Sequence, residues 1–209
     1  MLGNRFKAAA ALALACVLFL TSCSQTPQAS PKGEAEAAKA SAPGAPVTGK
    51  TAFWEMYKSA HAWAADLTPL TLQSQAVAGV KNESGKAAMW KATFGSPRKH
   101  EARTYTYAVA AQSPDIAKGV SVGLALPWGG PTQSALPFDT ADFSVDSDGA
   151  YQTAVAQAAA WVKRHPGKEP TLAMGNASRF DGPVWLVHWG DQKSGYAVYV
   201  SAKSGAVVK

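Results

Sequence analysis

The chain has 209 residues, of which 47% are hydrophobic and 16% charged, and its formal net charge is +6 at pH 7. This charge is small and the basic residues are dispersed, without the basic stripe of a nucleic-acid binder, so we expect no nucleic-acid partner. The length allows one hydrophobic core or two small ones. The cysteines, Cys16 and Cys23, both lie near the N-terminus, so the folded part is expected to have no disulfide.

The first 22 residues are typical of a secretory signal peptide. Arg5 and Lys7 form a short positive region, and residues 8–20 are apolar but too few to span a bilayer comfortably. Small residues then lead to Cys23, and Leu20-Thr21-Ser22-Cys23 resembles the lipobox of bacterial lipoproteins. We therefore predict a signal peptide over residues 1–22.

The resemblance to lipoproteins implies a diacylglycerol on Cys23, cleavage before this residue, and acylation of the new amino group, for example with palmitate. Several acyl chains hold a protein on a membrane more firmly than one, because each buried methylene contributes about 0.8 kcal/mol. Ser24 stands where an Asp retains lipoproteins at the inner membrane. The resemblance therefore implies a lipid-anchored protein of the cell envelope, at the outer membrane and facing the periplasm.

Residues 24–50 consist mainly of Ser, Pro, Ala, Gly, Gln, Lys and Glu, and Val47 is their only large apolar residue. A segment of this composition cannot bury enough surface to offset the entropy lost on ordering. We therefore predict a lipidated cysteine and flexible tether over residues 23–50. Such a tether would hold the folded part about 30 Å from the lipid on average.

The folded part is predicted to begin at residue 51 with an amphipathic helix. Apolar side chains recur at three- and four-residue steps from Phe53 to Leu67, and Thr68-Pro69 ends the pattern. Turns containing Gly or Pro separate the β-rich runs that follow. We predict strands over residues 77–81, 87–94, 102–110 and 120–128.

Residues 129–147 are rich in Gly, Pro, Ser, Thr and Asp. Because a structureless loop of this length is unusual inside one compact domain, we predict a linker here. A second amphipathic helix is predicted to follow, with Asp148 as its N-cap and with His165-Pro166-Gly167 as its end. Strands are predicted over residues 171–178, 184–190, 195–202 and 206–209.

The two halves carry similar motifs in the same order, which indicates an internal repeat. Residues 60–64 correspond to 158–162, residues 90–94 to 185–189, and residues 105–109 to 196–200. We therefore predict an α+β fold of two repeated units, residues 51–128 and 148–209. Each unit is expected to have one helix packed on an antiparallel β-meander.

The second half resembles the PepSY family. Its Tyr196-Ala197-Val198-Tyr199-Val200-Ser201-Ala202 and Ser204-Gly205-Ala206-Val207 are close to the family patterns Y-x-V-x-V-[DN]-A and T-G-x-V. Ser201 replaces the usual Asp or Asn, and Ser204 the usual Thr. The tandem arrangement is also similar to the β-lactamase inhibitor proteins. The resemblance implies a PepSY-like, non-catalytic binding or inhibitory protein that needs no cofactor, although fold analogy alone is a weak guide to function.

One motif suggests an enzyme. Gly119-Val120-Ser121-Val122-Gly123 fits the G-x-S-x-G nucleophile elbow, and Asp146 and His188 follow in the order of α/β-hydrolases. The elbow requires a helix directly after the serine, whereas residues 124–131 contain two Pro and two Gly. We therefore expect no enzymatic activity, with a lipid-anchored esterase that uses Ser121 as an alternative.

The sequence also predicts no metal site. The four histidines are scattered, and no pair of them has a ligand-like spacing with a nearby carboxylate. Asp142, Asp146 and Asp148 lack the glycine and glutamate that a calcium loop needs at its sixth and twelfth positions. Helix capping and solvation explain these aspartates better.

Strand alternation places one set of side chains opposite the face that the helices would cover. The set comprises Lys91, Thr93, Thr104, Thr106, Leu186, His188 and Tyr199. A mixed surface with Tyr, Leu and His can bind an envelope protein or peptide, whereas a solvated face or one covered by the other half is the alternative. We therefore predict a non-enzymatic protein- or peptide-binding, or inhibitory, lipoprotein, with a structural or assembly lipoprotein of the outer membrane as the second hypothesis.

Overall fold

The computed structural model describes residues 44–191 and 194–209. The predicted signal peptide and Cys23 lie outside these residues. Strand β1 (Val47–Thr48) and the first two residues of helix α1 (Gly49–Trp63) fall in the stretch whose composition suggested a tether. Strand β1 pairs with β3 (Lys86–Ala87) in a small two-stranded sheet.

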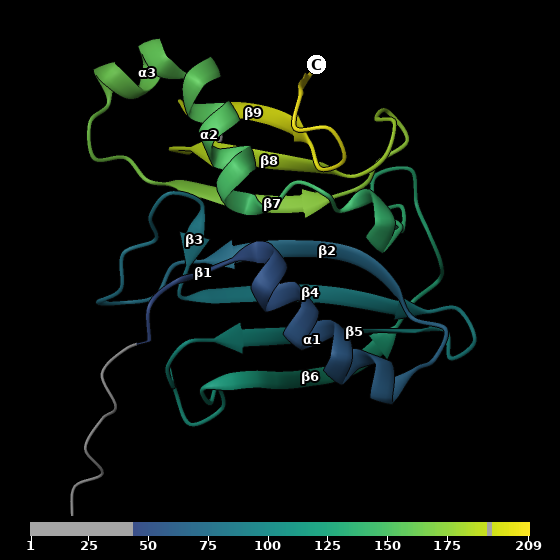
Figure 1. The fold of residues 1–209 in the computed structure, drawn as a ribbon. Helices are drawn as coiled ribbons and strands as arrows, with labels where there is room; N and C mark the ends of the chain where they lie inside the picture. The colour runs from purple at the N-terminus through teal and green to yellow at the C-terminus, as the bar shows by residue number, and fades with distance from the viewer. Residues whose placement is uncertain (1–43, 192–193) are drawn as a thin grey trace, which may run out of the picture. The chain divides into compact units, whose positions relative to one another are not determined.

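The other strands of the described chain form one antiparallel sheet of eight strands in the order β10-β9-β8-β7-β2-β4-β5-β6 (Figure 1). Its strands are β2 (Thr68–Gln75), β4 (Met89–Ser96), β5 (Glu101–Ala108), β6 (Gly119–Pro127), β7 (Pro170–Gly175), β8 (Val184–Trp189), β9 (Tyr196–Ser201) and β10 (Val207–Val208). Because each interior strand pairs on both sides, only β6 and β10 are edges.

The predicted fold class, two repeated units of one helix on a meander, is wrong, because the structure is mostly β and the strands of both predicted units belong to the same eight-stranded sheet. The strands of the two predicted units are joined at β2, which pairs with β4 on one side and with β7 on the other. The predicted strands did not include β2, since Thr68-Pro69 was interpreted only as the end of a helix. Strand β2 starts there instead, with Pro69 at its second position.

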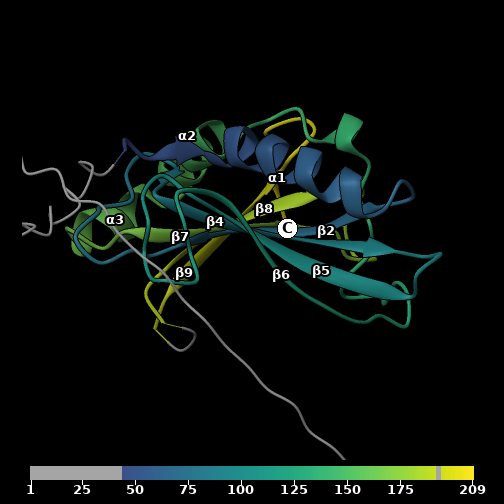
Figure 2. The same ribbon diagram turned by 90° about the horizontal axis from the view of Figure 1, so that it is seen from below.

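The helices α1 and α2 (Ser147–Gln157) lie on the same side of the sheet (Figure 2). The second predicted helix is in fact two, because the chain breaks at Ala158 and continues as α3 (Ala159–Arg164). Its N-cap is Asp146, two residues before the predicted cap at Asp148. Asp148 instead lies in the first turn of α2, where a carboxylate favours the positive end of the helix dipole.

The N-termini of α1 and α2 meet and hold each other. The first N–H groups of a helix have no partner within the helix. Here Gly49 N–H donates to Ser147 Oγ and Lys50 N–H donates to Asp146 Oδ1, both at 2.8 Å. The fully buried Ser147 hydroxyl in turn donates to the carbonyl of Gly85 at 2.6 Å. Asp146 and Ser147 thus link the starts of both helices to each other and to the turn before β3.

The core lies between these helices and the sheet. Trp90 and Trp185 are fully buried in contact with each other, with ring centroids 6.2 Å apart. Their indole N–H groups donate to the carbonyls of Val47 at 3.0 Å and Val145 at 2.9 Å. Since these two carbonyls immediately precede the N-caps of α1 and α2, each tryptophan both fills the core and positions the start of a helix.

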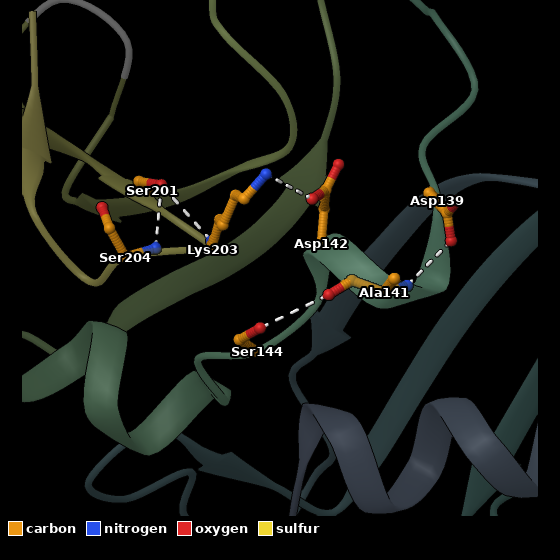
Figure 3. A network of polar contacts seen from close by, with 7 residues as sticks. All are labelled: Asp139, Ala141, Asp142, Ser144, Ser201, Lys203 and Ser204. Carbon is orange, nitrogen blue, oxygen red and sulfur yellow. Dashed lines mark hydrogen bonds and ion pairs between the residues drawn. The ribbon is translucent and has the colours of Figure 1, made fainter.

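The connection from β6 to α2 is tied to the C-terminal end of the sheet (Figure 3). It contains a short 3-10 helix, Thr140–Asp142, in which Asp139 caps the N–H of Ala141 at 2.8 Å. Asp142 forms an ion pair with Lys203 at 3.0 Å, on the turn after β9. Two backbone N–H groups of that turn donate to the hydroxyl of Ser201.

Candidate functional site: the open face of the sheet

The face of the sheet opposite α1 and α2 carries the seven side chains that strand alternation selected. On β4, Lys91 and Thr93 are partly exposed and alternate with the fully buried Trp90, Ala92 and Phe94. The other members, Thr104, Thr106, Leu186, His188 and Tyr199, are likewise partly exposed. We call this surface the open face.

The strand register brings four of the seven into one row across the sheet. Thr106 is opposite Lys91, and Leu186 is opposite Tyr199. Gln73 of β2 and Ala173 of β7 join the two pairs, since Lys91 is opposite Gln73, Gln73 opposite Ala173, and Ala173 opposite Leu186. The row therefore crosses the β2–β7 seam without a break.

The other three predicted residues lie to either side of this row. Thr93 and Thr104 are opposite each other, and their hydroxyl oxygens are 3.2 Å apart and share a hydrogen bond. His188 lies on the other side of the row, opposite Thr171 and Ala197. The structure therefore does not bring His188 together with the threonine pair.

A hollow of about 370 Å³ opens on this face at the β2–β7 seam. Its volume is in the range of small-ligand sites, or of a site for one or two side chains of a partner. Its lining residues include Thr71, Gln73, Ser134, Ala135, Ala173, Asn176, Arg179, Phe180, Leu186 and Tyr199. None of the residues that line it is acidic, and Arg179 is the only basic one.

Arg179, Phe180 and Tyr199 form one wall of the hollow, which we call the aromatic wall. The Phe180 and Tyr199 ring centroids are 5.2 Å apart. The Arg179 guanidinium carbon lies 4.4 Å from the Phe180 centroid and 4.8 Å from that of Tyr199. Stacking on the two rings holds the guanidinium in place while leaving its N–H donors available. None of the ion pairs within the described ranges involves Arg179.

A second, larger hollow of about 520 Å³ adjoins the first, with Leu70, Thr71 and Ala135 lining both. It extends past Thr93 to Trp128 and the loop over residues 129–132. Trp128 packs against Gly95, where an added Cβ would lie 2.8 Å from the indole ring. Because they share these residues, the two hollows make one depression on the open face.

Sequence reasoning missed the residues that give this depression its character. Thr71 and Gln73 lie on β2, a strand it did not predict, and Arg179 and Phe180 lie in the loop after β7. The sequence signal that could have identified them is a basic residue, Arg179, directly before an aromatic one, Phe180, in a loop that otherwise contains Gly, Asn, Ser and Asp. Their proximity to Tyr199 depends on strand pairing that no local pattern reveals.

The hydrolase hypothesis finds no supporting geometry. Ser121 lies in the middle of β6, and the strand continues to Pro127 with no helix after it. His188 is on β8, and four strands lie between β6 and β8. At about 4.8 Å per strand this is a separation of roughly 24 Å, far beyond hydrogen-bond reach. The structure therefore does not bring Ser121 and His188 into a catalytic pair.

The described residues include neither a cluster of metal ligands nor a membrane-spanning helix. In residues 44–191 and 194–209, no three His, Cys, Asp or Glu side chains come together in a way that could hold a metal ion. In the same ranges, no helix has both the length and the apolar composition needed to cross a bilayer.

No protein-family model matches the chain, and no curated protein matches it at a significant level. The resemblance to PepSY domains therefore gains no support from this source. Among solved structures, the chain is similar to a candidate lipoprotein from Clostridium difficile 630, with 10% identity and a TM-score of 0.47. The match covers 79% of this chain and 91% of that one. At this TM-score the likeness does not establish a shared fold.

Proposed function

We propose that this protein is a lipid-anchored, non-enzymatic protein of the cell envelope that binds an extended, carboxylate-bearing segment of a protein or peptide on its open face. The observation that carries the proposal is the hollow at the β2–β7 seam with Arg179 held on its wall. The anchor rests on the motif Leu20-Thr21-Ser22-Cys23 and on the signal-like residues before it.

Carboxylate recognition follows from the chemistry of the hollow. Arg179 presents a planar fork of N–H donors, which fits a carboxylate in a bidentate manner. No acidic side chain lines the hollow, so nothing within it competes for the guanidinium. The acceptor on the partner is an acidic side chain or a C-terminal carboxylate.

The rest of the depression suits a polypeptide. Gln73, Asn176 and Ser134 offer neutral donors and acceptors, while Leu186, Phe180 and Tyr199 offer apolar surface. Rigid aromatic side chains beside an arginine are typical of the residues that dominate binding energy in protein interfaces. This combination supports a binding module better than a purely structural lipoprotein, for which no specific surface would be needed.

The test is site-specific photocrosslinking in intact cells that express the full chain. A photoreactive phenylalanine analogue replaces Tyr199 in one variant and Ala197 in the control. Ala197 is exposed on the same strand and the same face, but it does not line the hollow. We expect a discrete adduct from position 199 that is absent from position 197.

Arg179→Ala, combined with the photoreactive residue at position 199, tests whether Arg179 binds a carboxylate of the partner. We expect the adduct to disappear in this variant and to persist, at reduced yield, in Arg179→Lys, which keeps the charge but loses the planar fork. An adduct that is unchanged by Arg179→Ala would overturn carboxylate recognition. The absence of any adduct from position 199 would overturn the open-face site and favour the assembly-lipoprotein hypothesis.

The anchor has its own test. Replacing Cys23 with serine is expected to move the protein from the membrane fraction to the soluble fraction and to abolish its labelling with radioactive palmitate. Outer and inner membranes can be separated by density, and we expect the wild-type protein in the outer one. Membrane retention of Cys23→Ser without palmitate label would contradict lipid anchoring.

A further inference from the structure

A smaller pocket adjoins the depression of the open face at Trp128, and we call it the Trp128 pocket. Its volume is about 220 Å³. Pockets that hold drug-sized ligands are larger, roughly 300–1,000 Å³. The Trp128 pocket shares part of its lining with the larger of the two hollows, namely Trp128, Gly129, Gly130 and Pro131. It therefore continues the depression at the end away from Arg179.

The lining of the Trp128 pocket is rigid and mostly apolar. Besides the residues shared with the hollow, it consists of Thr68, Pro97, His100 and Pro137. None of the residues that line it is acidic, and none is a lysine or an arginine. Proline side chains have almost no rotamer freedom to lose, so three prolines in the lining lower the entropic cost of binding. A pocket of this size and chemistry fits one large apolar side chain.

Trp128 is held in place before any ligand binds. The six-membered ring of its indole lies against Gly95, where a side chain would displace it. Its backbone N–H donates to the carbonyl of His100 at 2.8 Å. His100 itself has a φ of 53°, a left-handed conformation that is costly for any residue except glycine. Backbone strain of this kind is typically found at ligand-binding and active sites, where the surrounding structure maintains it.

From these observations we infer that the Trp128 pocket binds a large apolar side chain of the same partner segment whose carboxylate is bound by Arg179. This inference rests on the proposed function and adds a second anchor point to it. Apolar side chains that fill a preformed aromatic pocket contribute much of the binding energy in protein interfaces. The partner is thereby specified as a segment with a carboxylate at one end and a large apolar residue at the other.

The strand register sets the spacing between the two anchor points. The row that contains Tyr199 crosses four strand spacings to reach Lys91 on β4, and Gly95, which contacts Trp128, is four residues further along β4. At about 4.8 Å per strand and 3.4 Å per residue, the diagonal is roughly 23 Å. An extended chain covers this distance with about seven residues. Thr71, which lines both hollows, lies near the middle of this diagonal.

The experiment extends the photocrosslinking of the full chain in intact cells. The photoreactive phenylalanine analogue replaces His100 in one variant and Lys99 in the control, which is exposed in the same turn but does not line the pocket. We expect an adduct from position 100 with the same partner as from position 199, and none from position 99. Mass spectrometry should place the two crosslinked residues on one segment of the partner, about six to eight residues apart.

Trp128→Ala, combined with the photoreactive residue at position 199, tests whether the pocket contributes to binding. We expect the yield of the adduct to fall about tenfold or more, as for an anchor residue, with an unchanged far-ultraviolet circular dichroism spectrum. Trp128→Phe keeps an aromatic face and should retain most of the yield. The matched control is Trp54→Ala, because Trp54 is 36% exposed on α1, on the other side of the sheet (Figure 2).

The outcomes separate this inference from the proposed function. An adduct from position 199 without one from position 100 would overturn the inference and leave the proposed function intact. Crosslinks from the two positions to different proteins, or to separate segments of one protein, would overturn it as well. Equal yields in Trp128→Ala and Trp54→Ala would have the same meaning. The absence of any adduct from position 199 would overturn the proposed function, and this inference with it.

Discussion

The two faces of the sheet use the same strands for different purposes. On β4, Trp90 is completely buried under the helices, whereas its neighbour Lys91 faces the open side. The covered face is held by apolar contacts and by the hydrogen bonds of the fully buried Trp90 and Trp185 indoles. The open face carries side chains whose partners are one another or solvent. Stability should therefore depend mainly on the covered face, and partner binding on the open one.

The largest expected effect comes from a pair of neighbours on opposite faces. Trp90→Ala removes a fully buried indole and its hydrogen bond to Val47, and should lower the free energy of unfolding by about 3–5 kcal/mol. Lys91→Ala should change it by less than about 0.5 kcal/mol. Urea denaturation of both variants measures this difference. Similar losses in the two variants would contradict the division of roles between the faces.

The next effect concerns the junction of the two helices. Ser147→Ala leaves the Gly49 N–H and the Gly85 carbonyl without their buried partner, which should cost about 1–3 kcal/mol. Ser144→Ala is the matched control, because Ser144 is exposed and its hydroxyl donates a long hydrogen bond of 3.4 Å to the carbonyl of Ala141. Equal denaturation midpoints for the two variants would show that the junction does not stabilise the fold.

The alternation of side chains along each visible strand could be predicted from sequence, and it placed Lys91, Thr93, Leu186 and Tyr199 on a common face. The pairing of β2 with β7, which joins the two halves in one sheet, could not be predicted from sequence. Strand β2 begins with Thr68-Pro69, a typical end signal for a helix. One of its inward-facing residues is Ser74, a buried polar residue where the pattern of a core strand would have an apolar one.

Ser74 is satisfied by a distant partner, since its hydroxyl accepts from the N–H of Leu172 at 2.9 Å. The two residues are 98 positions apart in the chain, so a local pattern cannot reveal the bond. The same limit applies to Arg179, whose position beside Tyr199 follows from the pairing of β7, β8 and β9. Local periodicity thus predicts which way a side chain points, but not which strand lies next to it.

A smaller effect is expected within the open face itself. Tyr199→Ala removes the ring on which Phe180 and Arg179 pack, and should cost about 1 kcal/mol of stability. Tyr199→Phe keeps the ring and should be nearly neutral. Thermal denaturation of the two variants measures this difference in stability. A loss as large as that of Trp90→Ala would mean that the aromatic wall is a structural element and not a binding surface.

The smallest expected effect lies at the end of β4, where Asp66, in the turn before β2, contacts Ser96 and Arg98. Asp66 accepts hydrogen bonds from the N–H of Arg98 and from the hydroxyl of Ser96, each at 2.8 Å. The Arg98 backbone bond is the main cause that holds the pKa of the Asp66 carboxyl below its usual value, with the Ser96 bond adding to it.

A carboxyl whose pKa is lower in the folded state stabilises the fold above its unfolded pKa of about 3.9, and this contribution is lost as the pH falls through the folded value. Stability should therefore decrease on acidification below about pH 4, and Asp66→Asn should show a shallower decrease. Urea midpoints measured from neutral to acidic pH test this prediction, with Lys91→Ala as a variant that should keep the wild-type slope. An unchanged slope in Asp66→Asn would show that the turn between β4 and β5 is not held by this carboxylate.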